Sequence, residues 1–167
     1  FASYSEIIER IGDNRLKIYL YHFPRMSGIS ISLDLIGRLL KRYPDTIVGM
    51  KDSSGNFENM SRVVQNFPDF DIFSGTDDFF LPLLEQGGVG CITATCNIAS
   101  NLSAHLFKAW QDGDGASKKL QAKLTNIRIA AQTFPFSVSL KTVLAHYSGL
   151  QSWRYVRPPL VSLDDDQ

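Results

Sequence analysis

The chain has 167 residues, with 17 basic and 17 acidic side chains and a formal net charge of +0. This length fits one ordinary domain with a hydrophobic core. The balanced, scattered charges argue against a nucleic-acid partner, and no apolar run approaches the ~20 residues of a membrane span. The chain opens on Phe1, already inside a helical pattern, so we expect its start to differ from the start of the gene.

The first two thirds of the chain alternate between helical and strand patterns. Tyr4, Ile7, Ile8 and Ile11 recur at helical spacing, and Gly12 is placed to end that helix. The later elements are predicted in this order: a strand at 16–23, a loop at 24–30, a helix at 32–43, a strand at 47–51, a helix at 57–66, a strand at 71–74, a loop at 75–78, a helix at 79–86 and a strand at 89–95.

The last third carries no strand pattern. Asn97 can cap the helix that follows it, and three helices are predicted, at 97–111, 115–133 and 135–147. An apolar tail with Pro158 and Pro159 ends in three aspartates at 164–166. The two cysteines, Cys91 and Cys96, have the spacing of neither a disulfide framework nor a zinc pair, so we expect free thiols and a cytoplasmic location.

Strands that alternate with helices of this length predict an α/β protein with a parallel sheet and right-handed crossovers. Four such strands fit either a small open sheet or half of an eight-stranded barrel, and the pattern does not choose between them. In both cases the carboxyl ends of the strands meet at one edge, where α/β proteins build their active sites.

Lys51 is the first candidate for chemistry, because it ends the apolar strand 47–51. Side chains alternate along a strand, so Ile47, Gly49 and Lys51 share one face. A buried lysine is costly unless its ammonium group reaches water or a partner, or loses its proton. An unprotonated amine is the nucleophile of Schiff-base enzymes. The alternative is a lysine that extends out to solvent at the strand end.

Tyr21 and an acidic pair lie at the same predicted edge. Tyr21 could meet Lys51 if their strands are neighbours, and a phenol beside an amine suits acid–base work in imine chemistry. The alternative for Tyr21 is packing in the core. Asp77 and Asp78 could bind a metal or substrate hydroxyls, although a helix N-cap also explains them. The three histidines show no spacing that suggests a metal site.

Four segments carry a resemblance to a known family: 21–28 (YHFPRMSG), 48–55 (VGMKDSSG), 74–78 (SGTDD) and 87–90 (GGVG) with Asn97. In this order they resemble the dihydrodipicolinate synthase/N-acetylneuraminate lyase family of class I aldolases. The resemblance runs through essentially the whole chain. It implies the second half of a (β/α)8 TIM barrel, strands five to eight, in residues 1–97, and the last barrel helix with a C-terminal helical region in residues 98–167.

The resemblance also implies roles for single residues. Lys51 matches the lysine that forms an imine with pyruvate or another 2-oxo acid, and Tyr21 matches the tyrosine that carries protons. The main chain at Ile92 is expected to line the pyruvate end. Four further positions match contacts to the distal part of the substrate in sugar-acid lyases: Ser53, Gly75, Asp77 and Asp78. The protonated imine is the electron sink, so no metal and no organic cofactor is expected.

One position departs from the synthases. Five residues after the tyrosine these enzymes carry an arginine, and this chain has Met26, with Arg25 one place earlier. An arginine grips a carboxylate through two hydrogen bonds, which methionine cannot form. This favours a lyase or aldolase that acts on a hydroxylated 2-oxo acid, with pyruvate as one partner.

Two alternatives remain. One is dihydrodipicolinate synthase itself, which condenses pyruvate with aspartate semialdehyde. The other is an inactive barrel fragment that needs its N-terminal half, because the glycine-rich segment with paired threonines that holds the pyruvate carboxylate is not in this chain. The family resemblance further implies a homo-oligomer, a dimer or a tetramer.

Overall fold

The computed structural model describes residues 1–164, which fold as two compact units, the first Phe1–Ile92 and the second from Thr93 onward. Of the three predicted tail aspartates, those at 165 and 166 lie outside the described residues. No helix within residues 1–164 has both the length and the apolar character needed to cross a membrane. The predicted division at residue 97 refers to the plan of a complete barrel and stays a prediction.

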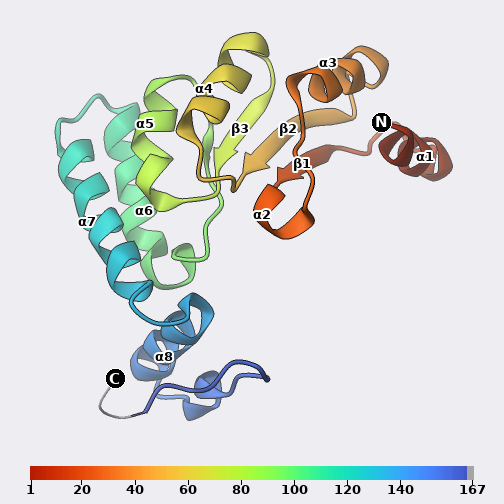
Figure 1. The fold of residues 1–167 in the computed structure, drawn as a ribbon. Helices are drawn as coiled ribbons and strands as arrows, with labels where there is room; N and C mark the ends of the chain where they lie inside the picture. Colours follow the sequence, from red (N-terminus) through yellow and green to blue (C-terminus); the bar gives the residue numbers. More distant parts are fainter. Residues whose placement is uncertain (165–167) are drawn as a thin grey trace. The chain divides into compact units, whose positions relative to one another are not determined.

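The first unit alternates helices and strands along the chain (Figure 1). Its elements are α1 (Ala2–Ile11), β1 (Ile18–His22), α2 (Pro24–Ser27), α3 (Leu33–Arg42), β2 (Ile47–Asp52), α4 (Phe57–Asn66), β3 (Asp71–Ser74), a 3₁₀ turn (Asp77–Phe79), α5 (Phe80–Glu85) and β4 (Gly90–Cys91). The four strands form one parallel sheet in the order β1-β2-β3-β4. This confirms the prediction of an α/β protein with a parallel sheet.

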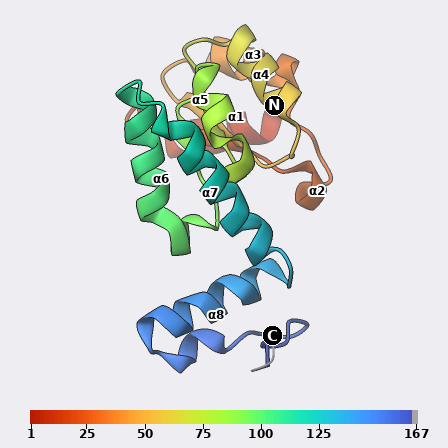
Figure 2. The same cartoon turned by 90° about the vertical axis from the view of Figure 1, so that its left-hand side faces the viewer.

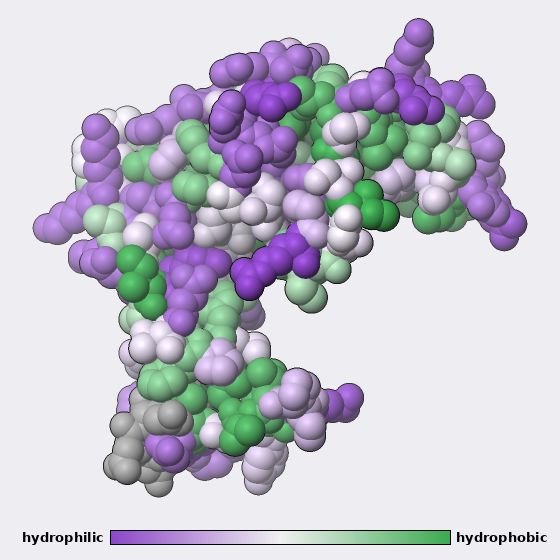
Figure 3. All heavy atoms as spheres, in the orientation of Figure 1, coloured by the Kyte–Doolittle hydropathy of each residue, from purple (hydrophilic) through white to green (hydrophobic). Residues whose placement is uncertain are grey.

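Helices α3 and α4 begin at side-chain caps and pack on one face of the sheet. The Ser32 hydroxyl accepts from the Leu35 N–H at 3.1 Å, and the Asn56 side chain accepts from the Asn59 N–H at 3.1 Å. Between these helices and the sheet lies a core of fully buried side chains: Ile36, Leu39, Ile47, Met50, Met60, Val63, Ile72 and Leu83. Hydrophilic side chains cover the outer side of the unit over α3 and α4 (Figure 3). The core therefore fixes which face of β2 carries Lys51, because Met50 occupies the other face. Ile47 belongs to the same core as Met50, so the prediction that Ile47 shares a face with Lys51 is wrong.

The pairing of β1 with β2 contains one irregularity. Ile18 pairs with Ile47, but the next residue, Tyr19, pairs with Gly49, so that Val48 is passed over. An extra residue of this kind is a β-bulge, which re-aims the side chains that follow it. From Tyr19 onward the register is regular to the ends of the two strands.

Several local expectations differ from the structure. The predicted loop after β1 contains the short helix α2, which Pro24 begins and Gly28 ends with φ of 71°. The strand predicted at 89–95 is regular only at Gly90–Cys91. The prediction that Asn97 caps the next helix is wrong, because this helix starts at Cys96 and the Asn97 side chain donates to the Ala94 carbonyl at 2.9 Å.

The second unit is helical, as predicted. It contains α6 (Cys96–Gln111), α7 (Ala116–Ala131), α8 (Phe136–Ser148) and a 3₁₀ turn (Gln151–Arg154). Helices α6 and α7 lie side by side and run in opposite directions (Figure 2). Hydrophobic side chains gather on the surface over α8 and the segment after it (Figure 3). The exposed large side chains of this part of the chain include Tyr147, Leu150, Tyr155 and Val161.

Candidate active site

Tyr21 and Lys51 are direct partners across two neighbouring parallel strands. Tyr21 lies near the end of β1 and pairs with Lys51 near the end of β2. The Lys51 ammonium nitrogen lies 4.2 Å from the centre of the Tyr21 ring. A cation at this distance is attracted by the negative face of the ring. The sheet thus brings together the two residues that were predicted from the sequence to work as a pair.

Neighbouring groups change the pKa of the Tyr21 phenol. Burial raises the pKa of Tyr21, but hydrogen bonds with Ser53 and Lys51 and the positive charge of Lys51 lower it by more, so this pKa lies below its ordinary value. Hydrogen bonds to the charged form of an acid and a nearby opposite charge both favour loss of the proton. The pair therefore holds a phenol that gives up its proton more readily than a free tyrosine, next to a primary amine.

Ser53 and Gly75 are held together just beyond the ends of the strands. The Ser53 N–H donates to the His22 carbonyl at 2.8 Å, and the Gly75 N–H donates to the Asp52 carbonyl at 2.7 Å. A Cβ on residue 75 would lie 2.1 Å from the Ser53 hydroxyl oxygen, closer than atoms can approach. Only glycine leaves room here for the serine that contacts Tyr21.

Ile92 and the acidic pair lie further along the same edge. The Ile92 N–H donates to the Ser74 carbonyl at 2.8 Å, and its side chain is 45% exposed. Asp77 opens the 3₁₀ turn and is fully buried. Asp78 is half-buried, and one of its carboxylate oxygens accepts from the Thr76 hydroxyl at 3.3 Å. Of the two aspartates, Asp78 thus has the more open side chain.

Two aromatic residues on the same face as Tyr21 and Lys51 were not singled out from the sequence. The Tyr19 hydroxyl donates to the Asp71 carboxylate at 2.7 Å, and the rings of Tyr19 and Phe73 meet edge to face with centres 5.6 Å apart. The Tyr19 ring covers Gly49, where a Cβ would lie 2.5 Å from a ring carbon. Strand alternation predicts this shared face once the register is known.

Asp52 is a further residue whose role the sequence analysis missed. It is fully buried, and its two carboxylate oxygens accept from the Ser54 N–H and from the Asn59 side-chain amide, both at 2.7 Å. These two hydrogen bonds link the turn after β2 to α4 and thereby hold Ser53, which lies in that turn, in place. The signal is an aspartate before a Ser-Ser-Gly-Asn turn, because aspartate commonly bonds its own backbone two residues on.

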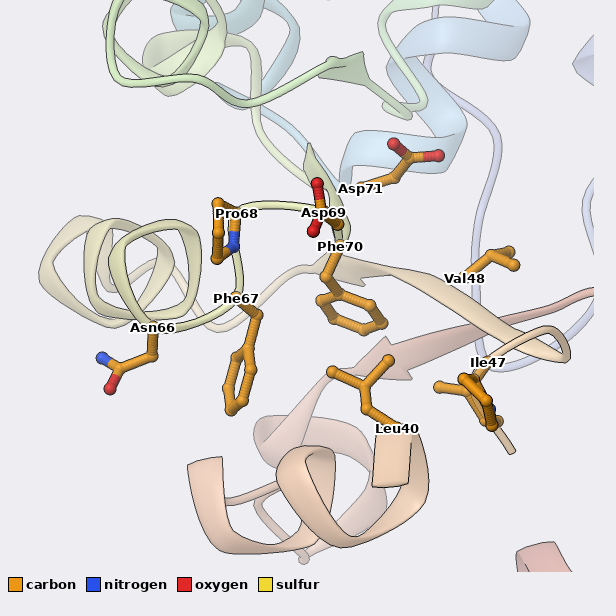
Figure 4. A pocket seen from close by; sticks show the side chains of 10 residues that line it. Leu40, Ile47, Val48, Asn66, Phe67, Pro68, Asp69, Phe70 and Asp71 are labelled. Atoms are coloured by element: carbon orange, nitrogen blue, oxygen red, sulfur yellow. The ribbon is translucent and has the colours of Figure 1, made fainter. Parts of the chain in front are cut away.

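A separate cavity of about 470 Å³ lies at the opposite ends of the strands (Figure 4). The side chains of Leu40, Phe67 and Phe70 face one another there, at the starts of β2 and β3. This cavity lies away from Lys51 and contains none of the candidate residues. Within residues 1–164, no three His, Cys, Asp or Glu side chains are grouped so as to hold a metal ion.

Both the sequence and the structure of this chain are similar to those of known proteins. A sequence model of the dihydrodipicolinate synthetase family matches residues 2–167. The chain is 31% identical to a 4-hydroxy-tetrahydrodipicolinate synthase of Methanopyrus kandleri, over 99% of the chain and 54% of that protein. It is 34% identical to a probable 2-dehydro-3-deoxy-D-pentonate aldolase of Escherichia coli, over 90% of the chain and 52% of that protein.

A solved structure of the same family is also similar to this chain. A prophage protein of the dihydrodipicolinic acid synthase family from Escherichia coli, in complex with pyruvate, is 29% identical with a TM-score of 0.80, over 90% of this chain and 52% of that one. The chain therefore spans about half the length of the relatives that it matches.

Proposed function

Because the chain belongs to the dihydrodipicolinate synthetase family, we propose that the intact protein is a Schiff-base lyase that makes or breaks a carbon–carbon bond of a hydroxylated 2-oxo acid. Pyruvate is one partner in this reaction. The observation that carries the proposal is the pairing of Lys51 with Tyr21, with 4.2 Å between the ammonium nitrogen and the ring centre, near the carboxyl ends of β1 and β2.

In this mechanism the Lys51 amine attacks the 2-oxo carbon, and loss of water gives an imine. The protonated imine draws electrons from the neighbouring carbon–carbon bond, so that cleavage leaves an enamine on Lys51 and releases an aldehyde. Tyr21 carries the proton that the substrate hydroxyl loses and that the enamine carbon later gains. A phenol with a lowered pKa suits a group that must both take and return a proton. This chemistry needs no metal and no organic cofactor.

The same proposal gives the other candidate residues their places. The main chain at Ile92 lines the pyruvate end, while Ser53, Gly75, Asp77 and Asp78 contact the distal hydroxyl groups. Strands β1–β4 form strands five to eight of a (β/α)8 barrel, with the helices of residues 98–167 following as the last barrel helix and a C-terminal helical region. The partial coverage of the solved relative, 52% of its length at a TM-score of 0.80, supports this plan.

Met26 favours the aldolase over the synthase. It lies on α2 and is 75% exposed, where it offers a flexible apolar surface and no cation. The likeness to a probable pentonate aldolase points the same way, and the likeness to a 4-hydroxy-tetrahydrodipicolinate synthase keeps the synthase as the alternative. We also propose that the intact protein is a homo-oligomer, either a dimer or a tetramer, and that it is located in the cytoplasm.

Reductive trapping tests the proposal. The intact protein is incubated with pyruvate and borohydride, and peptide mapping is expected to find one reduced pyruvate on Lys51. Lys51→Met should abolish the adduct, while Lys17→Met, which changes a lysine near the start of β1, should keep it. An adduct on another lysine, or none with any 2-oxo acid tried, would overturn the assignment.

A further inference from the structure

An apolar cavity of about 380 Å³ lies within the second unit. Its walls come from the start of α6, the end of α7, helix α8 and the tail of the chain, and none of its lining residues carries a charge. Most of them are hydrophobic, among them Ile98, Ile127, Ala131, Phe134, Val143 and Leu163. This volume and this mostly apolar lining are typical of sites that bind small molecules.

The tail of the chain forms one wall of the cavity. Leu163 lines it and is only 9% exposed. The Leu163 carbonyl accepts from the Arg154 side chain at 2.7 Å, and the Ser162 hydroxyl donates to the Arg154 carbonyl at 2.8 Å. These two hydrogen bonds hold the tail against the 3₁₀ turn that follows α8 and so keep Leu163 in place as a wall.

Ser139 is an independent indication of a ligand. It lines the cavity and is only 6% exposed, and its hydroxyl has no hydrogen-bond partner in the part of the chain that the structure describes. Thr142, three residues later on the same side of α8, instead donates to the Val138 carbonyl at 3.0 Å. Because no hydrogen bond holds the Ser139 hydroxyl, rotation about one side-chain bond can direct it into the cavity. A buried hydroxyl without a partner costs free energy unless a ligand or a water bonds to it.

The lining determines which kind of molecule fits. A charged ligand would lose its hydration without meeting an opposite charge, so the ligand is neutral. An apolar body gains free energy when it leaves water for these walls. An apolar cavity of about 150 Å³ in another protein takes up benzene. The present cavity is larger, so it has room for a ring with a substituent.

We propose that this cavity binds a small uncharged alcohol with an apolar, ring-sized body. The walls contact the body of the ligand, and the ligand hydroxyl forms a hydrogen bond with the Ser139 hydroxyl. The site shares no residue with the Tyr21–Lys51 pair, because all of its lining residues belong to the second unit. The proposal is therefore independent of the Schiff-base chemistry.

Calorimetric titration of the intact protein with benzyl alcohol, and in a second arm with toluene, tests the proposal. Both compounds have the same ring, and only the alcohol can bond to Ser139. We expect saturable binding of benzyl alcohol in the millimolar range or tighter. Ser139→Ala should weaken it about fivefold, the usual loss when an uncharged hydrogen bond is removed, and should leave the affinity for toluene unchanged. Ser137→Ala is the matched control, because Ser137 is an exposed serine of the same helix outside the cavity.

Two further measurements place the ligand. Val143→Phe puts a larger side chain into the cavity and should abolish binding of both compounds. In methyl NMR of the unchanged protein, benzyl alcohol should shift the resonances of Ile98 and Ile127, and should leave that of Ile72, in the core of the first unit, unchanged.

Three results would each overturn the proposal. The first is absence of saturable binding of benzyl alcohol. The second is an affinity for benzyl alcohol that Ser139→Ala leaves unchanged, or lowers no more than the affinity for toluene. The third is a set of methyl shifts that omits both Ile98 and Ile127. None of these measurements depends on lyase activity.

Discussion

The ammonium group of Lys51 lies over the face of the Tyr21 ring, 4.2 Å from its centre, and the two residues are register partners in neighbouring parallel strands. Their separation is therefore set by backbone hydrogen bonds between β1 and β2. A pair of side chains on two hydrogen-bonded strands is held more rigidly than a pair on loops.

We expect Tyr21→Phe to leave imine formation on Lys51 possible but to lower kcat by roughly 10²–10⁴-fold, the usual contribution of a positioned proton carrier. Tyr19→Phe is the matched control, because Tyr19 lies on the same face but hydrogen-bonds to Asp71. Steady-state kinetics and borohydride trapping on both variants check this. A Tyr21→Phe enzyme with nearly normal kcat would mean that this ring only packs.

Ser53→Ala should raise the pKa of Tyr21, because the hydrogen bond with Ser53 is one of the interactions that lower it. At a fixed alkaline pH the variant then holds a smaller fraction of Tyr21 as phenolate. Ultraviolet titration measures this once the curve of the matching Tyr21→Phe protein has been subtracted, since the chain contains 6 tyrosines. Ser152→Ala, an exposed serine of the second unit, should leave the pKa unchanged. An unchanged or lower pKa in Ser53→Ala would contradict the assignment.

Gly75→Ala should both destabilise the protein and lower activity. The new Cβ would lie 2.1 Å from the Ser53 hydroxyl oxygen and 2.7 Å from the Asp52 carbonyl oxygen. Overpacking of this kind costs about 1–3 kcal/mol, and relief requires Ser53 to move away from Tyr21. Gly115→Ala is the control, because a Cβ there meets nothing within 4 Å. Denaturant unfolding of both variants measures the difference, and equal stabilities would show that the site has more room than the structure gives it.

Substrate choice can be tested at Met26. We expect kcat/KM for a 3-deoxy-2-oxo sugar acid to exceed that for pyruvate plus aspartate semialdehyde by at least ~10-fold. Met26→Arg should raise the synthase reaction, because a charge-assisted contact to the semialdehyde carboxylate contributes about 1.5–3 kcal/mol. Met26→Leu keeps the apolar surface and should change neither reaction. Efficient dihydrodipicolinate formation by the unchanged protein would favour the synthase instead, with Arg25 supplying the missing charge.

The polypeptide of residues 1–167, produced alone, is expected to self-associate or to bind a complementary barrel half. Strands β1 and β4 are the outer strands of the sheet, and the sheet face that carries Tyr19 and Tyr21 is open, with these two residues 47% and 52% exposed. Unpaired strand edges and open apolar faces favour pairing with other chains. Sedimentation velocity measures this, and a stable isolated monomer would contradict the expectation.

The alternation of elements was predictable because each helix has an apolar stripe at helical spacing and each strand a short apolar run. The Tyr21–Lys51 contact was predicted only on the condition that their strands are neighbours, which a single sequence cannot fix. Two features were missed for physical reasons. The strand at Gly90–Cys91 is shorter than the strand pattern at 89–95 predicts, and α2 is a single turn that begins at Pro24 within a predicted loop. The role of Asp52 was missed because it depends on a hydrogen bond from the Asn59 side chain. This bond forms only when α4 packs against the sheet, and a single sequence does not fix that packing.

Val48 is the extra residue in the pairing of β1 with β2. A one-residue deletion in β2 therefore has a different effect on the strand register according to which residue is removed. Removal of the Val48 codon would give an unbroken register and still bring Tyr21 opposite Lys51. Removal of the Met50 codon, only two triplets later, would turn the lysine side chain toward α3 and α4. Two in-frame deletions of the same size, almost at the same place, would thus have opposite consequences for the direction of the Lys51 side chain.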